Sequence, residues 1–180
     1  MENCRGFVLA GGRSRRMGQD KARLLWDGVP LVVHQWKRLE ALVPGAAVIG
    51  GDYRDLGLRE VVDGYPGEGP LGGILTALGH SPAALILAVD MPLVSTAALR
   101  ALLRMAEADA VVPRHPDGRI QPLAALYRPT ARPKLQAAFD GGTRRVVEAI
   151  SALEVVWFDT GAEEFGAMNT LAEYKEALHP

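Results

Sequence analysis

Short, mostly apolar runs bounded by glycine, proline or charged residues predict buried β-strands along the chain. The predicted strands are GFVLA at 6–10, AAVIG at 46–50, REVV at 59–62, ALILAV at 84–89 and VVWFD at 155–159. The first strand opens into Gly11 and Gly12, and the strand at 84–89 ends at Asp90. The first strand is therefore followed directly by two conformationally permissive glycines, and the strand at 84–89 is followed directly by a carboxylate.

Apolar residues at helical spacing occupy the segments between these strands and predict amphipathic helices. Pro30 can take the first position of one helix and Ser95 can cap another, because both residue types favour helix starts. Two shorter helical segments precede residue 155. The positions that define the other helices are Val32, Trp36, Leu39 and Val43; the small residues of 72–79; Leu99, Leu102 and Leu103; and Leu171, Tyr174 and Leu178 behind a capping Thr170.

Two turn signals interrupt this pattern. A brief extended piece at 24–26 precedes the turn pair Asp27–Gly28, and the runs AVVP at 110–113 and PLAALY at 122–127 flank Asp117–Gly118. The second arrangement fits either a hairpin or a crossover loop.

Strands that alternate with helices predict an α/β fold: an open, mostly parallel sheet with helices on both faces. A chain of 180 residues is long enough for one substantial core, so residues 1–180 are expected to form a single domain. Open sheets of this kind bind ligands beyond the carboxyl ends of their strands. Gly11 and Asp90 both fall at such ends.

Composition narrows the range of partners. The formal net charge of −1 argues against a general affinity for nucleic acid or for an anionic membrane, since both require a positive excess. The single cysteine, Cys4, cannot form an internal disulfide, and no apolar run approaches the length of a membrane span. A cytoplasmic protein is therefore expected.

Residues 9–21, LAGGRSRRMGQDK, carry the strongest chemical signal. Glycines let the backbone approach an anion closely, and guanidinium and ammonium groups neutralise phosphate oxygens. The segment lacks both the GxGxxG dinucleotide fingerprint and the lysine and hydroxyl of a P-loop. It reads as a triphosphate cradle built from Gly11, Gly12 and Gly18 with Arg13, Arg15, Arg16 and Lys21.

Each candidate residue also has an interpretation that involves no ligand. The cradle could be a solvated arginine-rich loop, but its place directly after a buried strand favours a ligand site. Asp90 could be a turn or capping residue, but one charge at the end of an apolar strand favours a metal. Asp20 is read as a local partner of Lys21 or an arginine. The four histidines are expected to be surface or helix-end residues. Trp26, Trp36 and Trp157 are expected to lie in the core.

The motif at 9–21 resembles the signature of the molybdenum cofactor guanylyltransferases, a group of Rossmann-like nucleotidyltransferases. Weaker similarities extend over nearly the whole chain: GPLGG at 69–73, AVDMP at 88–92, GTRRV at 142–146 and MNT at 168–170. The resemblance implies a fold of the nucleotide-diphospho-sugar transferase type. It also implies transfer of GMP from GTP to molybdopterin, with release of pyrophosphate.

The resemblance also assigns roles to residues. Arg16 and Lys21 would contact the phosphates, and Asp90 would hold Mg²⁺, with Mn²⁺ as an alternative ion. Asn169 and one of Arg144 and Arg145 match positions on the molybdopterin side. The nucleotide-binding positions implied are Leu9, Ala10, Gly11, Gly12, Lys21, Asp63, Gly69, Gly73 and Asp90.

Two departures from the family pattern and two alternative functions remain. Gly50 stands where the family commonly has a nucleotide-contacting asparagine, and Ala167 replaces another asparagine. A CTP-dependent enzyme acting on molybdopterin or on a sugar or polyol phosphate is the nearest alternative, although related cytidylyltransferases carry LAAG where this chain has LAGG. The other is a nucleotide-binding regulatory module without turnover. Implied partners are GTP, molybdopterin and proteins that deliver molybdopterin or mature molybdoenzymes.

Overall fold

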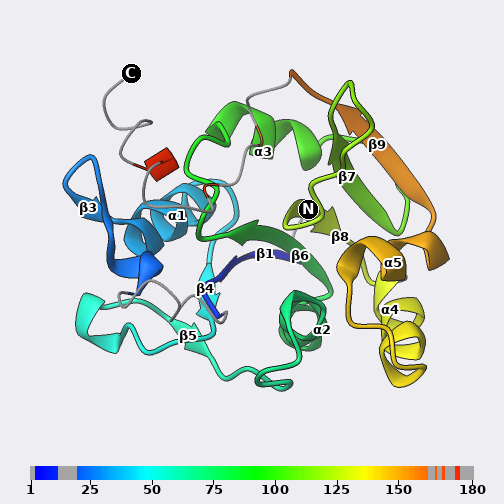
Figure 1. Ribbon diagram of the computed structural model, residues 1–180, viewed down its shortest axis with the longest axis horizontal. Helices are drawn as coiled ribbons and strands as arrows, with labels where there is room; N and C mark the ends of the chain where they lie inside the picture. The colour runs from blue at the N-terminus through cyan, green and yellow to red at the C-terminus, as the bar shows by residue number, and fades with distance from the viewer. Residues whose placement is uncertain (1–2, 12–19, 162–164, 166–167, 169–172, 175–180) are drawn as a thin grey trace.

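The computed structural model describes residues 3–11, 20–161, 165, 168 and 173–174 of the chain. Its centre is a seven-stranded sheet with the order β5-β4-β1-β6-β8-β7-β9 (Figure 1). The strands are β1 (Cys4–Leu9), β4 (Ala47–Ile49), β5 (Glu60–Val61), β6 (Ala83–Ala88), β7 (Ala110–Arg114), β8 (Ala124–Tyr127) and β9 (Val155–Asp159). The mostly parallel open sheet expected from the sequence is confirmed.

The strand directions place one antiparallel strand in this sheet. β1 runs parallel to β4 and β6, and β7 runs parallel to β9, while β8 lies antiparallel between β6 and β7. The segments around Asp117–Gly118 therefore form a hairpin, the first of the two expected alternatives. A crossover to a parallel strand would need a longer connection than the chain provides here.

Helices cover both faces of the sheet. The elements are α1 (Leu31–Glu40), α2 (Pro70–His80), α3 (Thr96–Leu102), α4 (Ala131–Asp140) and α5 (Val146–Ala149), with 3₁₀ turns η2 (Lys21–Arg23), η3 (Arg54–Leu56) and η4 (Ile150–Ala152). Ser95 caps α3 as expected, since its hydroxyl accepts a 3.0 Å hydrogen bond from the Ala98 amide.

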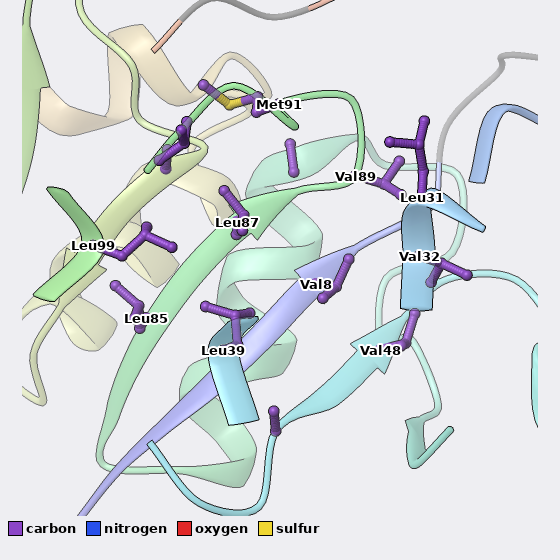
Figure 2. Close-up of a cluster of buried hydrophobic side chains, with 14 of the residues drawn as sticks. Val8, Leu31, Val32, Leu39, Val48, Leu85, Leu87, Val89, Met91 and Leu99 are labelled. Carbon is purple, nitrogen blue, oxygen red and sulfur yellow. The ribbon is translucent and has the colours of Figure 1, made fainter. Parts of the chain in front are cut away.

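Alternating side chains of β1 and β6 separate the interior into two cores. Val8, Leu85 and Leu87 pack with α1 and α3 on one face, as Figure 2 shows. Phe7, Leu9 and Ile86 pack with α2, α4 and α5 on the other. Period-two alternation of apolar side chains on both faces is what a strand buried between two helical layers requires.

A small hairpin precedes α1 and corrects one expectation. β2 (Leu25–Trp26) pairs with β3 (Val29–Pro30) across Asp27–Gly28, whose φ angles of 49° and 77° mark a tight turn. Pro30 thus belongs to β3, and α1 begins at the next residue. The ring of Pro30 removes an amide that an edge position does not need.

Three other sequence expectations turn out differently or fall outside the described residues. His115 is buried beside Gln121 and is not a surface residue. Trp157 is 36% exposed, because it lies on the edge strand β9 under the guanidinium of Arg114. Of the predicted closing helix, Tyr174 is buried, whereas Thr170, Leu171 and Leu178 lie outside the described residues.

Within the described part of the chain, no helix has the length and apolar character to cross a membrane.

Candidate active site

The carboxyl ends of β1, β4 and β6 meet at one edge of the sheet. The Ala10 amide donates to the carbonyl of Ile49 at 2.9 Å, and the Val89 amide donates to the carbonyl of Leu9 at 3.1 Å. Leu9, Ala10 and Gly11 therefore lie between the ends of β4 and β6, at the carboxyl-end edge of the sheet. Gly12 and Arg16, the next two predicted residues, lie outside the described residues, as do Arg13, Arg15 and Gly18.

Gly11 lies directly against Gly50, the first residue after β4. A Cβ atom on Gly50 would stand 2.5 Å from both the Cα and the amide nitrogen of Gly11, and the φ angle of Gly50 is +84°. Neither backbone atom can move aside as a flexible side chain would, and a positive φ favours glycine. A side chain at position 50 would therefore require the backbone of the turn after β1 or of the turn after β4 to shift.

Lys21 and Asp90 reach this edge from two other segments, and Met168 connects them. The Lys21 ammonium donates to the Met168 carbonyl at 3.4 Å, and the Met168 amide donates to the Asp90 carbonyl at 2.8 Å. One described residue from each of the three predicted motifs DK, AVDMP and MNT thus lies at this edge. Asn169 follows Met168 but lies outside the described residues.

Asp90 is half-buried at the turn that follows β6. Burial raises the pKa of its carboxyl, and the positive charge of Lys21 acts in the opposite direction. No group of three or more histidine, cysteine or acidic side chains able to hold a metal exists among the described residues. One partly buried carboxylate suits Mg²⁺, which commonly binds one or two protein carboxylates and takes its other ligands from substrate phosphates and water.

Asp63 and the glycines of GPLGG lie around the start of α2. One oxygen of Asp63 accepts from the Tyr65 amide at 2.9 Å and from the Thr76 hydroxyl at 3.1 Å, which fixes the loop before the helix. Gly69 caps α2 with a φ angle of +84°. A Cβ on Gly73 would lie 3.1 Å from the Leu9 side chain, so the glycine there allows α2 to pack closely on β1.

The two neighbouring arginines differ in environment. Arg144 donates to Glu68 at 2.5 Å and to the Phe139 carbonyl at 2.7 Å, and its guanidinium lies 3.9 Å from the centroid of the Phe139 ring. It therefore ties the turn between α4 and α5 to the loop before α2. Arg145 is exposed and pairs with Glu148 one turn further along, as expected of the start of an exposed helix.

Asp20 has the local role that the sequence indicated. It accepts from the Ala22 amide at 3.0 Å, lies 3.9 Å from Arg23 Nε, and accepts from the Tyr53 hydroxyl at 3.1 Å. Tyr53 is not among the residues that the sequence pattern singled out. The pair Gly50–Gly51 directly after a strand was the available signal for a special turn at this position.

The chain is similar to known proteins over most of its length. The model of the MobA-like NTP transferase domain matches residues 6–155. A Chloroflexus aggregans protein named probable molybdenum cofactor guanylyltransferase is 41% identical over 170 residues, which cover 88% of this chain and 80% of that protein.

Solved structures show the same fold. Molybdopterin-guanine dinucleotide biosynthesis protein A from Archaeoglobus fulgidus is 25% identical, with a TM-score of 0.78 over 96% of each chain. A manganese complex of a Mycobacterium tuberculosis protein is 16% identical, with a TM-score of 0.70 over 98% of each chain. At that lower identity, the likeness concerns the fold alone.

Proposed function

Since the chain belongs to the MobA-like NTP transferase family and is thus a nucleotidyltransferase, we propose that it transfers GMP from GTP to molybdopterin. The products are pyrophosphate and the guanine dinucleotide form of the cofactor, and residues 1–180 act as one domain. The observation that supports the proposal is the convergence of Gly11, Lys21 and Asp90 at one edge of the sheet.

In the proposed reaction, a terminal phosphate oxygen of molybdopterin attacks the α-phosphorus of GTP. A phosphoanhydride bond forms, the bond to the β-phosphate oxygen breaks, and the electron pair leaves with pyrophosphate. At a separation of about 4 Å and an effective dielectric constant of about 20, each pair of unit charges on the two anions repels by about 4 kcal/mol. Cationic groups must offset this repulsion.

Lys21 and Arg16 supply the positively charged side chains that face the phosphates. The backbone of Leu9–Gly12 approaches the nucleotide. Because the nucleophile is already an ionised phosphate, positioning and charge stabilisation account for most of the rate, and no strong general base is required. This fits a site with no histidine or cysteine among its predicted residues.

Asp90 is the residue that would hold Mg²⁺ in the complex with nucleotide. Bound there, the ion would neutralise phosphate oxygens and keep part of its water shell. Mn²⁺ prefers the same oxygen ligands and would serve as an alternative. The carboxylate also carries a negative charge that offsets the positive charge of Lys21 nearby.

The remaining predicted residues divide between the two substrates. We assign Asp63, Gly69 and Gly73 to the nucleotide, because they shape the loop and first turn of α2 beside Leu9. Arg144 and Asn169 are assigned to molybdopterin. Arg144 would reach the substrate from the turn between α4 and α5, where Glu68 and Phe139 hold it.

The test is pyrophosphate release in the presence of molybdopterin and Mg²⁺, measured with GTP and CTP separately. We expect release with GTP and little with CTP. A clear preference for CTP would overturn the guanine assignment and favour the cytidylyl alternative. Nucleotide binding without release under either condition would instead favour a regulatory module.

A further inference from the structure

The turn that follows β4 contacts the chain on both sides of segment 12–19, the part of the predicted phosphate-binding motif that lies outside the described residues. Gly50 lies against Gly11, where a Cβ atom would stand 2.5 Å from backbone atoms. Three residues further along, the Tyr53 hydroxyl donates to Asp20, at 3.1 Å from Oδ2. One short stretch of chain thus touches the last described residue before the segment and the first one after it.

Tyr53 is fixed from several directions. Its side chain is 1% exposed, and a Cβ on Gly51, whose φ angle is +95°, would stand 2.4 Å from the ring. The Arg23 guanidinium lies 5.4 Å from the ring centroid, and the Tyr53 amide donates to Glu60 of β5. A ring packed this closely can hold its hydroxyl in one place, unlike a long side chain in solvent.

Asp20 connects Tyr53 to Lys21, the next residue in the chain. Its carboxylate accepts from the Ala22 amide at 3.0 Å and so caps η2, the 3₁₀ turn whose first residue is Lys21. Lys21 in turn reaches toward Met168 and Asp90 at the centre of the candidate site. The direction of the lysine therefore depends on where Asp20 is held.

A second contact between the same elements is weaker. Arg23 donates to both oxygens of Asp55 at 2.8 and 2.9 Å, but the two side chains are 43% and 58% exposed. Ion pairs in solvent contribute little because water and salt screen them. Asp20 is also 47% exposed, but its partner Tyr53 is buried, so the Tyr53–Asp20 contact has one fixed side and the Arg23–Asp55 pair has none.

We propose that Tyr53 is a positioning residue of the nucleotide site: its hydroxyl holds Asp20 and thereby sets where Lys21 meets the triphosphate. This proposal rests on the proposed function, in which Lys21 contacts the phosphates of GTP. Tyr53 itself touches no substrate. It acts through Lys21, and its contribution exists only while that lysine is present.

A double-mutant cycle tests the proposal. GTP affinity in the presence of Mg²⁺ is measured by calorimetry for the wild type, Tyr53→Phe, Lys21→Ala and the double variant. We expect Tyr53→Phe to weaken binding about fivefold in the wild type, the fold-change that corresponds to about 1 kcal/mol. In the Lys21→Ala background the same change should have no effect, because neighbouring residues in one network are not additive.

Controls separate positioning from general stability. Tyr127→Phe removes another buried tyrosine hydroxyl, which donates to the Pro122 carbonyl at 2.8 Å, and it should leave GTP affinity unchanged. Asp20→Ala breaks the same link from the other side. It should weaken binding by at least as much as Tyr53→Phe, and adding Tyr53→Phe to it should change nothing further.

The outcomes separate this inference from the proposed function. If Lys21→Ala weakens GTP binding but Tyr53→Phe has the same effect with or without the lysine, the positioning role is wrong and the proposed function stands. An unchanged affinity in Tyr53→Phe overturns the inference as well. If Lys21→Ala itself leaves GTP binding unchanged, the proposed phosphate contact fails, and the role of Tyr53 fails with it.

Discussion

At the scale of single residues, Asp90 and Lys21 carry the proposed chemistry. Asp90 is half-buried at the end of β6, and its burial raises the pKa of the carboxyl against the effect of Lys21. A partly desolvated anion of this kind gains more from a bound cation than an exposed one, because water competes less for it. The burial and the position of the side chain therefore favour the same role.

Asp90→Asn keeps the shape of the side chain and removes its charge. We expect pyrophosphate release to fall by about a hundredfold or more, since the amide is a poor ligand for the metal on which the transfer depends. The Mg²⁺ concentration for half-maximal activity should rise. Asp140→Asn, at the exposed end of α4, serves as the control. Unchanged release in Asp90→Asn, with nucleotide still bound, would contradict the metal role.

The sequence pattern singles out Asp90 and Lys21 as candidates because Asp90 follows a buried strand and Lys21 follows a glycine–arginine run. Tyr53 has no such neighbour, and its partner Asp20 is 33 positions away along the chain. The environment of Trp157 depends on Arg114 of the adjacent strand β7. Contacts of this kind arise from sheet order, which a local pattern does not contain.

At the scale of elements, the turns after β1 and β4 depend on each other. Gly50 has a φ angle of +84°, and its neighbour across the turn is the backbone of Gly11. Since residues 9–11 are the described start of the proposed nucleotide site, the path of the β4 turn limits the path of that site. This accounts for the glycine at position 50.

Gly50→Ala tests this coupling, with Gly118→Ala as a matched control. Both glycines have φ angles of +84°, but a Cβ on Gly118 would meet nothing within 4 Å. The left-handed conformation should cost about 1–3 kcal/mol of folding free energy in each variant. Only Gly50→Ala should lose more than this and also weaken GTP binding. Equal denaturation midpoints and equal affinities in the two variants would contradict the coupling.

An ion pair between buried Asp109 and exposed Lys134 joins three elements at the start of β7. Asp109 is 4% exposed, lies 2.5 Å from the Lys134 ammonium of α4 and accepts from the Glu154 amide before β9 at 2.7 Å. Burial alone would raise the pKa of Asp109, but hydrogen bonds from Lys134, Thr130 and the Glu154 amide hold it at about 2, below its usual 3.8. The folded state therefore favours the ionised form of this carboxyl.

Asp109→Asn should reduce the free energy of unfolding at neutral pH by about 1–3 kcal/mol, since it leaves Lys134 without its charged partner. The stabilisation in the wild type is fully present above about pH 4 and is lost as the pH falls toward about 2. Denaturant titrations across this range should show the two proteins converging in acid. Asp117→Asn, in an exposed pair with Arg119, is the control. A difference that stays constant with pH would contradict the assignment.

The sequence predicted the elements better than their connections. The run ALILAV at 84–89 closely matches the observed strand β6, because six apolar residues that end at a charge fit a buried strand and are too few for a buried helix. The pattern left open whether the segments around Asp117–Gly118 form a hairpin. Whether a hairpin forms depends on how β8 pairs in the sheet. It pairs with β6 and β7, antiparallel to both.

At the scale of the whole molecule, the order of strands assembles the site. β1 lies between β4 and β6, so the ends of three strands from different parts of the chain reach one edge (Figure 1). Of the described C-terminal residues, Met168 contacts Asp90 at this edge, and Tyr174 packs against Trp26 of β2. Lys21, Asp90 and Met168 are far apart in the sequence and come close only through this topology.

The central claim is that this edge of the sheet binds magnesium-bound GTP. Its most direct test is a crystal structure of the protein with GTP and Mg²⁺. We expect the triphosphate between the backbone at Gly11 and the ammonium of Lys21, with the ion on the Asp90 carboxylate. A triphosphate bound at any other surface, or an ion held without Asp90, would contradict the account.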